Sequence, residues 1–165
     1  MKTTIGRTIC CLTLAAVALT ASPRVLGAQT MSRLTLQEAL QLIEAARADA
    51  AQRSLRLSIA VVDARGDLLA VARMPDANPP TADTAIGKAM AAAFFGQPSA
   101  ALAARSSSPI FQSLQLETGG RLRFFQGALP IVRGGVVVGA IGASGATAQQ
   151  DEDAAKAALA AVPLR

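Results

Sequence analysis

Two spacings of apolar residues alternate along the chain. Some stretches carry an apolar residue every three or four positions, and others are apolar throughout or at every second position. The first spacing is typical of helices that cover a sheet, and the second of strands. From Leu34 onward they predict a helix, two strands, a second helix with irregular pieces, three strands and a last helix. This order indicates an α+β domain with five largely antiparallel strands and helices on both faces.

Residues 129–146 predict a hairpin whose second arm is an interior strand. The arms are residues 129–133 and 136–141, and Gly134 and Gly135 between them suit a tight turn. The second arm is apolar or small at nearly every position, as expected of a strand covered on both faces. The glycines in this arm and directly after it, Gly139, Gly142 and Gly145, each weaken a strand by roughly 0.5–1 kcal/mol relative to alanine. They therefore indicate a close neighbour, either a helix packed tightly on the sheet or a bound ligand.

The first helix and the first hairpin also have clear signals. Thr35 and Glu38 have the spacing of a capping box and predict a helix that ends near Arg53. Strands at residues 57–62 and 68–74 follow, joined by a loop in which Gly66 takes a positive φ beside a bulge. The buried stripe of the helix is expected to be Leu36, Ala39, Leu40, Ile43, Ala46 and Ala50.

The second helix is apolar on more than one face. It is expected from about residue 82 to residue 95 and ends before Gly96. Its sheet-facing stripe would be Ile86, Ala89, Met90, Ala93 and Phe94. The opposite face, with Lys88, Ala91, Ala92 and Phe95, is also mostly apolar. Such a helix is covered twice, by the sheet and by a ligand, the following segment or another subunit.

Two further elements complete the pattern. In residues 121–126, Arg121, Arg123 and Phe125 alternate with Leu122 and Phe124. This alternation predicts the third strand. The last helix begins near Gln149, with acidic residues 151–153 in its first turn, where carboxylates favour the helix end. This helix would pack on the domain through three of its alanines, Ala154, Ala158 and Ala161.

The first 28 residues are expected to be a signal peptide. Lys2 and Arg7 precede an apolar run at residues 9–21, which is shorter than the roughly 20 apolar residues that span a membrane. The alternative is a retained membrane anchor. Cleavage is expected near residues 27–28, with residues 21–22 as the alternative. Cleavage after residue 28 would release a single domain of residues 29–165 to the periplasm or the exterior. Cys10 and Cys11 would leave with the peptide, so the domain would have no disulfide.

Charge and composition exclude several functions. Removing residues 1–28 takes away three cations and no acid, which lowers the net charge from +5 to +2. With no basic run, nucleic-acid binding is not expected. The chain contains no histidine, which excludes Ser-His-Asp and Cys-His catalysis and a His-ligated zinc. No nucleophile–base pair can be drawn, so an enzyme has little support, and no protein-held metal is expected.

Two features leave alternatives open. Lys88, inside an alanine-rich helix, either extends to water or contacts the acid group of a ligand or a neighbouring subunit. Residues 142–145 could offer backbone N–H groups to an anion. Asp63 and Asp67 are interpreted as turn residues, and Asp151 as a helix-start residue.

Three stretches of the chain resemble the GlcG/HbpS-like family of small haem-binding proteins. They read LSIAVVDARGDLLAVARM, DTAIGKAMAAAFFGQPSAAL and GALPIVRGGVVVGAIGASGATAQQDEDAAKAAL, and the similarity extends over residues 34–162. The resemblance implies a profilin-like three-layer α/β/α sandwich with a five-stranded antiparallel sheet. It also implies homo-oligomers, and in some members the binding of haem or a related tetrapyrrole.

The resemblance leads to a set of candidate haem-binding residues. Since the domain lacks histidine and cysteine, the axial candidates are Met74, Met90, Lys88 and Ser144. The haem propionates would pair with Arg73, Arg123 or Arg133. Among the basic residues, Arg73 and Lys88 match the family's pattern and are expected closest to the ligand.

The expected function is therefore that of an exported, non-catalytic binding protein for haem or a related tetrapyrrole, assembled as a homo-oligomer. Two alternatives remain. One is an interaction or accessory module whose alanine-rich faces pack subunits together. The other is a protein of small-organic-acid metabolism with no haem role.

Overall fold

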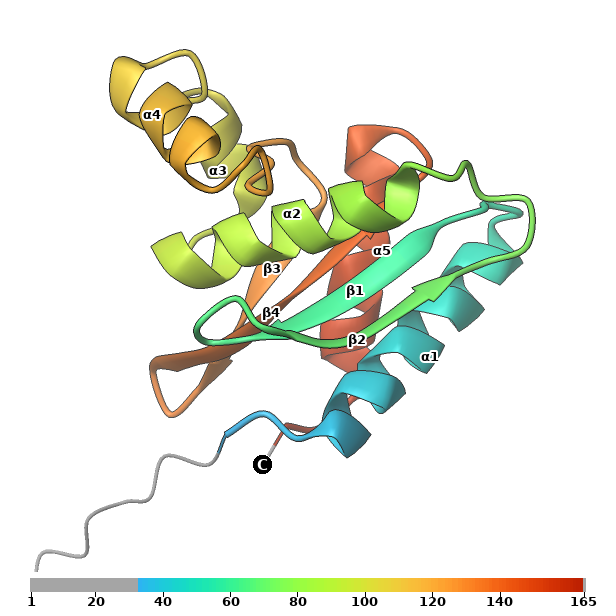
Figure 1. Ribbon diagram of the computed structural model, residues 1–165. Coiled ribbons are helices and arrows are strands. Elements are labelled where there is room, and N and C mark those ends of the chain that lie inside the picture. The colour runs from blue at the N-terminus through green and yellow to red at the C-terminus, as the bar shows by residue number, and fades with distance from the viewer. Residues whose placement is uncertain (1–32, 165) are drawn as a thin grey trace, which may run out of the picture. The chain divides into compact units, whose positions relative to one another are not determined.

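The structure, a computed structural model, describes residues 33–164. The signal peptide and its cleavage, predicted for residues 1–28, lie outside the described residues, as do Cys10 and Cys11. Residues 33–164 form an α+β fold around one antiparallel sheet (Figure 1). No helix in this part of the chain is long and apolar enough to cross a membrane.

The sheet in the described residues has four strands in the order β2-β1-β4-β3. Each neighbouring pair is antiparallel. As predicted, β4 is an interior strand, hydrogen-bonded to β1 and β3, whereas β2 and β3 are the outer strands. The strands are β1 (Ser58–Asp63), β2 (Leu68–Arg73), β3 (Ala128–Arg133) and β4 (Val136–Ser144).

The prediction of five strands is wrong at residues 121–126, which were expected to form the third strand in chain order. This segment is a loop that lies against the helix α2 (Thr81–Phe95). The backbone N–H of Arg123 donates to the Gly87 carbonyl at 3.2 Å, while Leu122 and Phe124 are buried in the apolar cluster around the helix. The alternation of residue types thus reflects alternate burial against a helix rather than pairing with a strand.

Both predicted hairpins form with the expected turns. Between β1 and β2, Oδ1 of Asp63 accepts the N–H groups of Arg65 at 2.8 Å and Asp67 at 3.0 Å. The register shifts between Val61 and Val62, which is the predicted bulge. Between β3 and β4, the two glycines at 134 and 135 have φ of +56° and +81°, the conformation of a tight primed turn.

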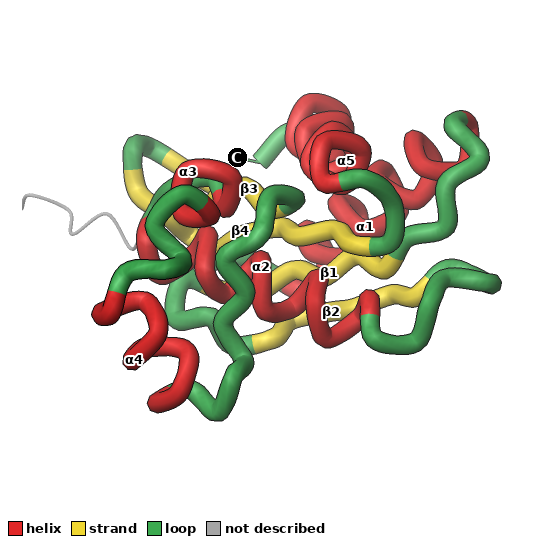
Figure 2. Tube along the Cα trace, turned by 90° about the horizontal axis from the view of Figure 1, so that it is seen from above, coloured by secondary structure: helices red, strands yellow, loops and turns green. Residues whose placement is uncertain are grey.

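The helices α1 (Leu36–Gln52) and α5 (Ala148–Ala161) pack side by side on one face of the sheet (Figures 1 and 2). The capping box of Thr35 and Glu38 is present, as predicted. The predicted stripe of α1 is wrong at Leu36 and Leu40, which are 54% and 44% exposed, and it omitted the buried Leu42. Because α1 contacts α5 as well as β1 and β2, its buried face is turned toward Leu42.

The helix α5 also differs in part from the prediction. Thr147 caps the helix, and of the three acidic residues expected in its first turn only Asp151 lies there. Ala154 and Ala158 are buried, but the third packing residue is Ala155, whereas Ala161 is exposed. The helix therefore presents a slightly rotated face to the sheet and to α1.

The helix α2 covers the opposite face of the sheet and ends at Gly96, as predicted (Figure 1). A Cβ atom on Gly142 of β4 would lie 2.5 Å from the Ala85 carbonyl oxygen and 3.2 Å from Cβ of Ala89. These approaches are closer than van der Waals contact. Tight packing of a helix on the sheet, one of the two alternatives, therefore explains this glycine.

The outer face of α2 is covered by the segment that follows it. This segment contains α3 (Ser99–Ala103) and α4 (Pro109–Glu117). Phe111 of α4 stacks on Phe95 with ring centroids 5.2 Å apart, and Phe124 meets Phe111 edge-on at 4.6 Å. Phe94, expected to face the sheet, is instead 47% exposed. The following segment is thus the second cover that the sequence left open.

Candidate functional site

One pocket of about 340 Å³ opens between α2 and the loop after α4, and we call it the α2 pocket. It contains Met90 and Arg123, two of the predicted site residues. Its side chains are of two kinds, apolar and charged. The apolar ones are Leu68, Ile86 and Met90, and the charged ones are Asp83, Arg121 and Arg123.

A glycine within α2 places the two arginines beside the helix. A Cβ on Gly87 would lie 2.3 Å from the Arg121 carbonyl oxygen and 2.5 Å from Cγ of Arg123. Only glycine therefore lets the loop lie directly on this turn of α2. A glycine inside a helix costs about 1 kcal/mol relative to alanine, so Gly87 was a signal in the sequence. Sequence reasoning missed it, and it missed Arg121 as a site residue.

Lys88 does not extend to water, which was one expectation for it, because its side chain is buried. The residue is 4% exposed. Its Nζ donates to Oδ2 of Asp151 at 2.8 Å and to the carbonyl of Ala143 at 3.1 Å. Lys88 does not line the α2 pocket. Its charge is balanced by an acid of the same chain.

Asp151 has more contacts than a helix-start residue needs. Its Oδ1 accepts the backbone N–H of Ala146 at 3.0 Å, and its Oδ2 binds Lys88. Burial raises the pKa of the Asp151 carboxyl, and the hydrogen bonds and charge of Lys88 offset only part of that rise. A Cβ on Gly127, whose φ is +131°, would lie 2.7 Å from Nζ of Lys88. The ion pair is enclosed by backbone on this side.

Two of the predicted arginines already bind other parts of the chain. Nη1 of Arg73 donates to the Ala77 carbonyl at 2.7 Å, just beyond the end of β2. Arg133 forms an ion pair with Glu38 of α1. Burial alone would raise the pKa of Glu38, but hydrogen bonds from Thr35 and the charge of Arg133 outweigh it and lower that pKa. Neither arginine lines the α2 pocket.

The remaining two candidates lie in the interior. Met74 is buried in the core beneath α1 and α5. Ser144 is buried at the end of β4, opposite Ser58 of β1. The structure thus brings Met90 and Arg123 together in one pocket and places Arg73, Met74, Lys88, Arg133 and Ser144 elsewhere.

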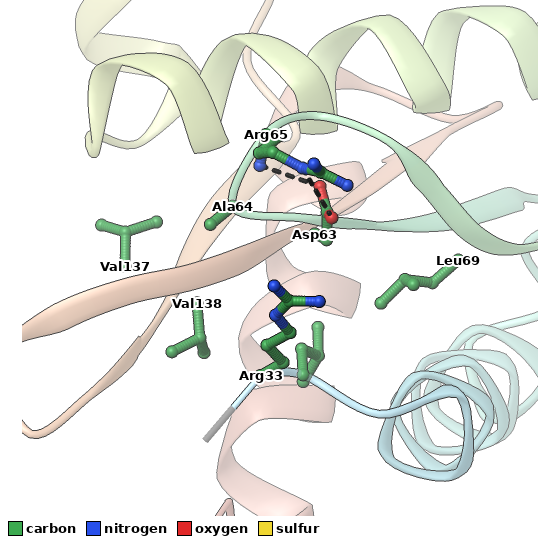
Figure 3. A pocket seen from close by; sticks show the side chains of 8 residues that line it. Arg33, Asp63, Ala64, Arg65, Leu69, Val137 and Val138 are labelled. Carbon is green, nitrogen blue, oxygen red and sulfur yellow. Dashed lines mark hydrogen bonds and ion pairs between the residues drawn. The ribbon is translucent and has the colours of Figure 1, made fainter. Parts of the chain in front are cut away.

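A second pocket of about 390 Å³ lies beside the turn of the β1–β2 hairpin, and we call it the hairpin pocket (Figure 3). Its charged side chains are Arg33, Asp63 and Arg65, and its apolar ones include Leu34, Leu69 and Val138. None of the predicted site residues lines it. Within residues 33–164, no group of three or more Asp, Glu, His or Cys side chains could hold a metal ion.

Sequence comparison relates the chain to proteins of known family. The family model described as "Haem degrading protein HbpS-like" matches residues 34–160. An uncharacterized 15.0 kDa protein of Citrobacter freundii is 32% identical over 133 residues, which are 79% of this chain and 93% of that protein. The corrinoid adenosyltransferase PduO of the same organism is also 32% identical over 133 residues, but the match spans only 40% of its length.

Solved structures that share the fold include three with 29–30% sequence identity. The Klebsiella pneumoniae protein ORFY superimposes with a TM-score of 0.74 and 30% identity, covering 81% of this chain and 93% of that one. A double mutant of Streptomyces reticuli HbpS gives a TM-score of 0.72 and 30% identity, covering 92% and 100% of the two chains. A complex of PduOC with haem gives 0.71 and 29% identity, covering 79% and 96%.

Proposed function

The chain belongs to the HbpS-like family, and from this premise we propose that it binds haem or a related tetrapyrrole in the α2 pocket. One observation carries the proposal. Arg121 and Arg123 stand together at a pocket whose other side chains include Leu68, Ile86 and Met90. The solved PduOC–haem complex, which shares the fold, supports the choice of ligand.

The residues present suit the two parts of such a ligand. A tetrapyrrole offers a broad apolar ring, for which the three apolar side chains supply contact, and it carries carboxylates that guanidinium groups bind strongly. Asp83 also lines the pocket, so the ligand carboxylates are expected on the side of Arg121 and Arg123. At about 340 Å³ the pocket is at the small end of ligand sites. Part of the ring would therefore lie outside it.

Met90 is the candidate axial ligand in this pocket. Its thioether belongs to one of the residue types that hold haem iron, whereas the charge of Lys88 is taken up by Asp151. When bound, haem would supply an iron that exchanges electrons and binds small molecules. We propose that ring burial, at roughly 25 cal/mol per Å², and carboxylate pairing provide most of the affinity. Iron-free protoporphyrin should then bind nearly as well as haemin.

The test is a titration of the protein with haemin and with protoporphyrin, followed by visible absorbance. The double variant Arg121→Glu/Arg123→Glu should bind both ligands at least about tenfold more weakly, because each lost charged hydrogen bond contributes about 1.5–3 kcal/mol. Arg56→Glu is the matched control for one charge reversal, since Arg56 is exposed and does not line the pocket. It should leave the affinity unchanged.

Other outcomes would contradict the proposal in different ways. A larger loss in Arg73→Glu than in the double variant would move the site to the end of β2, as the family pattern suggested. The absence of any Soret shift with haemin would remove the tetrapyrrole function. An interaction or accessory module would then be the better account.

Export and assembly remain predictions that accompany this function. The basic start and apolar run within residues 1–28 support secretion or a periplasmic location. A homo-oligomer was expected from the second apolar face of α2, but Phe95, Phe111 and Phe124 pack together there. A self-association surface would have to use other residues, such as the exposed Leu68 and Phe94. The binding role is proposed as non-catalytic.

A further inference from the structure

We propose that the hairpin pocket is a second binding site, for a small monocarboxylate with an apolar body. The site is separate from the α2 pocket, since none of its lining residues belongs to that pocket. It combines a volume of about 390 Å³, an arginine available to an anion and an apolar floor. This combination is typical of small-molecule sites, in which a few polar groups orient a mostly apolar ligand.

Arg33 is the cation that would bind the carboxylate. Its side chain extends into the pocket toward Asp63 (Figure 3). Among the described residues, no hydrogen bond or ion pair engages Arg33. By contrast, Arg65 is already paired, with Nη2 3.1 Å from Asp67 and Nε 3.7 Å from Asp63. A guanidinium binds a carboxylate through parallel N–H groups, so Arg33 can supply the head-group contact.

The floor of the pocket is apolar and well supported. Leu34 and Val138 are buried, and Leu69 is half-buried beside them. A Cβ on Gly139 would lie 2.3 Å from the Val62 carbonyl oxygen and 2.8 Å from Cδ2 of Leu34, so glycine at this position lets β1 approach and also leaves room for this leucine. An alkyl or aryl group placed here would remove apolar surface from water on both partners.

The charges of the pocket restrict the ligand to a single negative charge. Asp63 lines the same pocket and is held in place by two backbone N–H groups. Arg65 is neutralised by Asp67, with which it pairs, so the charges that a ligand meets in the pocket are the Arg33 guanidinium and the Asp63 carboxylate. A second carboxylate or a phosphate would lie close to Asp63 and would be repelled. The ligand class is therefore a monocarboxylate rather than a dicarboxylate or a phosphorylated metabolite.

The experiment compares hexanoate with hexanamide, a neutral molecule of the same shape, by isothermal titration calorimetry on the whole protein. Hexanoate should bind and hexanamide should bind much more weakly, because only the carboxylate pairs with Arg33. Arg33→Gln should weaken hexanoate binding about tenfold, as expected on loss of a charge-assisted hydrogen bond. Arg56→Gln removes an arginine outside both pockets and should change nothing.

A further variant separates the two pockets. Arg123→Gln should leave hexanoate affinity intact. If it weakens hexanoate binding while Arg33→Gln does not, the acid binds in the α2 pocket and the proposal is wrong. Equal affinity for hexanoate and hexanamide, or no heat of binding with hexanoate, would also overturn it. Haemin titration of the Arg33→Gln variant reports on the α2 pocket independently, so failure of one site is distinguishable from failure of the other.

Discussion

Lys88 and Asp151 are 63 positions apart in the chain, and their ion pair joins helices on opposite faces of the sheet. Both side chains are almost completely buried. Attraction between buried charges is largely offset by the cost of removing them from water, whereas a single buried charge without its partner is strongly unfavourable. The pair therefore specifies how α2 and α5 meet, more than it adds net stability.

We predict that Lys88→Met lowers the free energy of unfolding by about 3–5 kcal/mol, because Asp151 is left buried without its cation. The double variant Lys88→Met/Asp151→Leu should recover a large part of that loss. Urea denaturation measures both. A double variant that is no more stable than Lys88→Met would contradict this interpretation. If the double variant folds but no longer binds haemin, Lys88 belongs to the ligand site, as the family pattern suggested.

The site residues show what a sequence can reveal at this scale. Met90 and Arg123 were both candidates, but for different reasons, one as an iron ligand and the other as a partner of carboxylates. The acid that pairs with Lys88 could not be found, because no local spacing links it to α2. Arg121 was overlooked because its segment was interpreted as a strand. In that interpretation Arg123 was chosen as a partner of the ligand carboxylates, and nothing indicated that Arg121 lies beside it at the same pocket.

At the scale of elements, α2 and β4 approach each other at Gly142 more closely than a side chain at that position would permit. The helix backbone at Ala85 and Ala89 occupies the space in which a side chain would stand. This closeness lets α2 contact all four strands of the described sheet. It also fixes the turn of α2 that carries Ile86 and Met90 into the α2 pocket.

Gly142→Val should therefore lower the free energy of unfolding by about 1–3 kcal/mol, the usual cost of an overpacked core. The control is Gly134→Asn. Gly134 has a φ of +56°, and beyond its two chain neighbours no atom of the described residues lies within 4 Å of the position that its Cβ would take. Asparagine is favoured in such a turn, so this variant should be nearly neutral. Thermal unfolding compares the two, and equal melting temperatures would count against tight packing at Gly142.

Most elements could be predicted because their signals are local. The capping box of Thr35 and Glu38, the turn glycines and Gly96 each act within a few residues. Residues 121–126 could not be assigned in this way, since their alternation suits both a strand and a loop that lies on a helix. The choice between strand and loop depends on Gly87, which is distant in the sequence. Its carbonyl accepts the N–H of Arg123, and its lack of a side chain lets the loop lie on α2.

At the scale of the whole described domain, Glu38 and Arg133 join α1 to the β3–β4 hairpin across 95 positions of the chain. Both side chains are mostly buried. The lowered pKa of Glu38 means that the unfolded chain binds the proton more tightly than the folded one. The stabilisation is therefore complete above the ordinary pKa of 4.5 and is lost as the pH falls through the lower, folded value.

We predict that Glu38→Gln melts a few degrees below the wild type at pH 7 and that this difference shrinks as the solution is acidified below the ordinary pKa. The matched control is Glu44→Gln on the same helix. Within residues 33–164, Glu44 pairs with Arg47, and the two side chains are 68% and 41% exposed, so its replacement should change the melting temperature little at any pH. A difference for Glu38→Gln that stays constant down to strongly acidic pH would show that its charge is not the cause.

The two outer strands of the sheet differ in a way that bears on aggregation. A free strand edge can pair with a strand of another molecule, which is how ordered aggregates grow. On β3, Pro130 lacks the N–H group that such pairing needs, and proline is a common guard of edge strands. On β2, Leu68 and Val71 are exposed and no proline interrupts the strand. Uncontrolled extension of the sheet is therefore expected to begin at β2, where a single inserted charge would be the most direct protection.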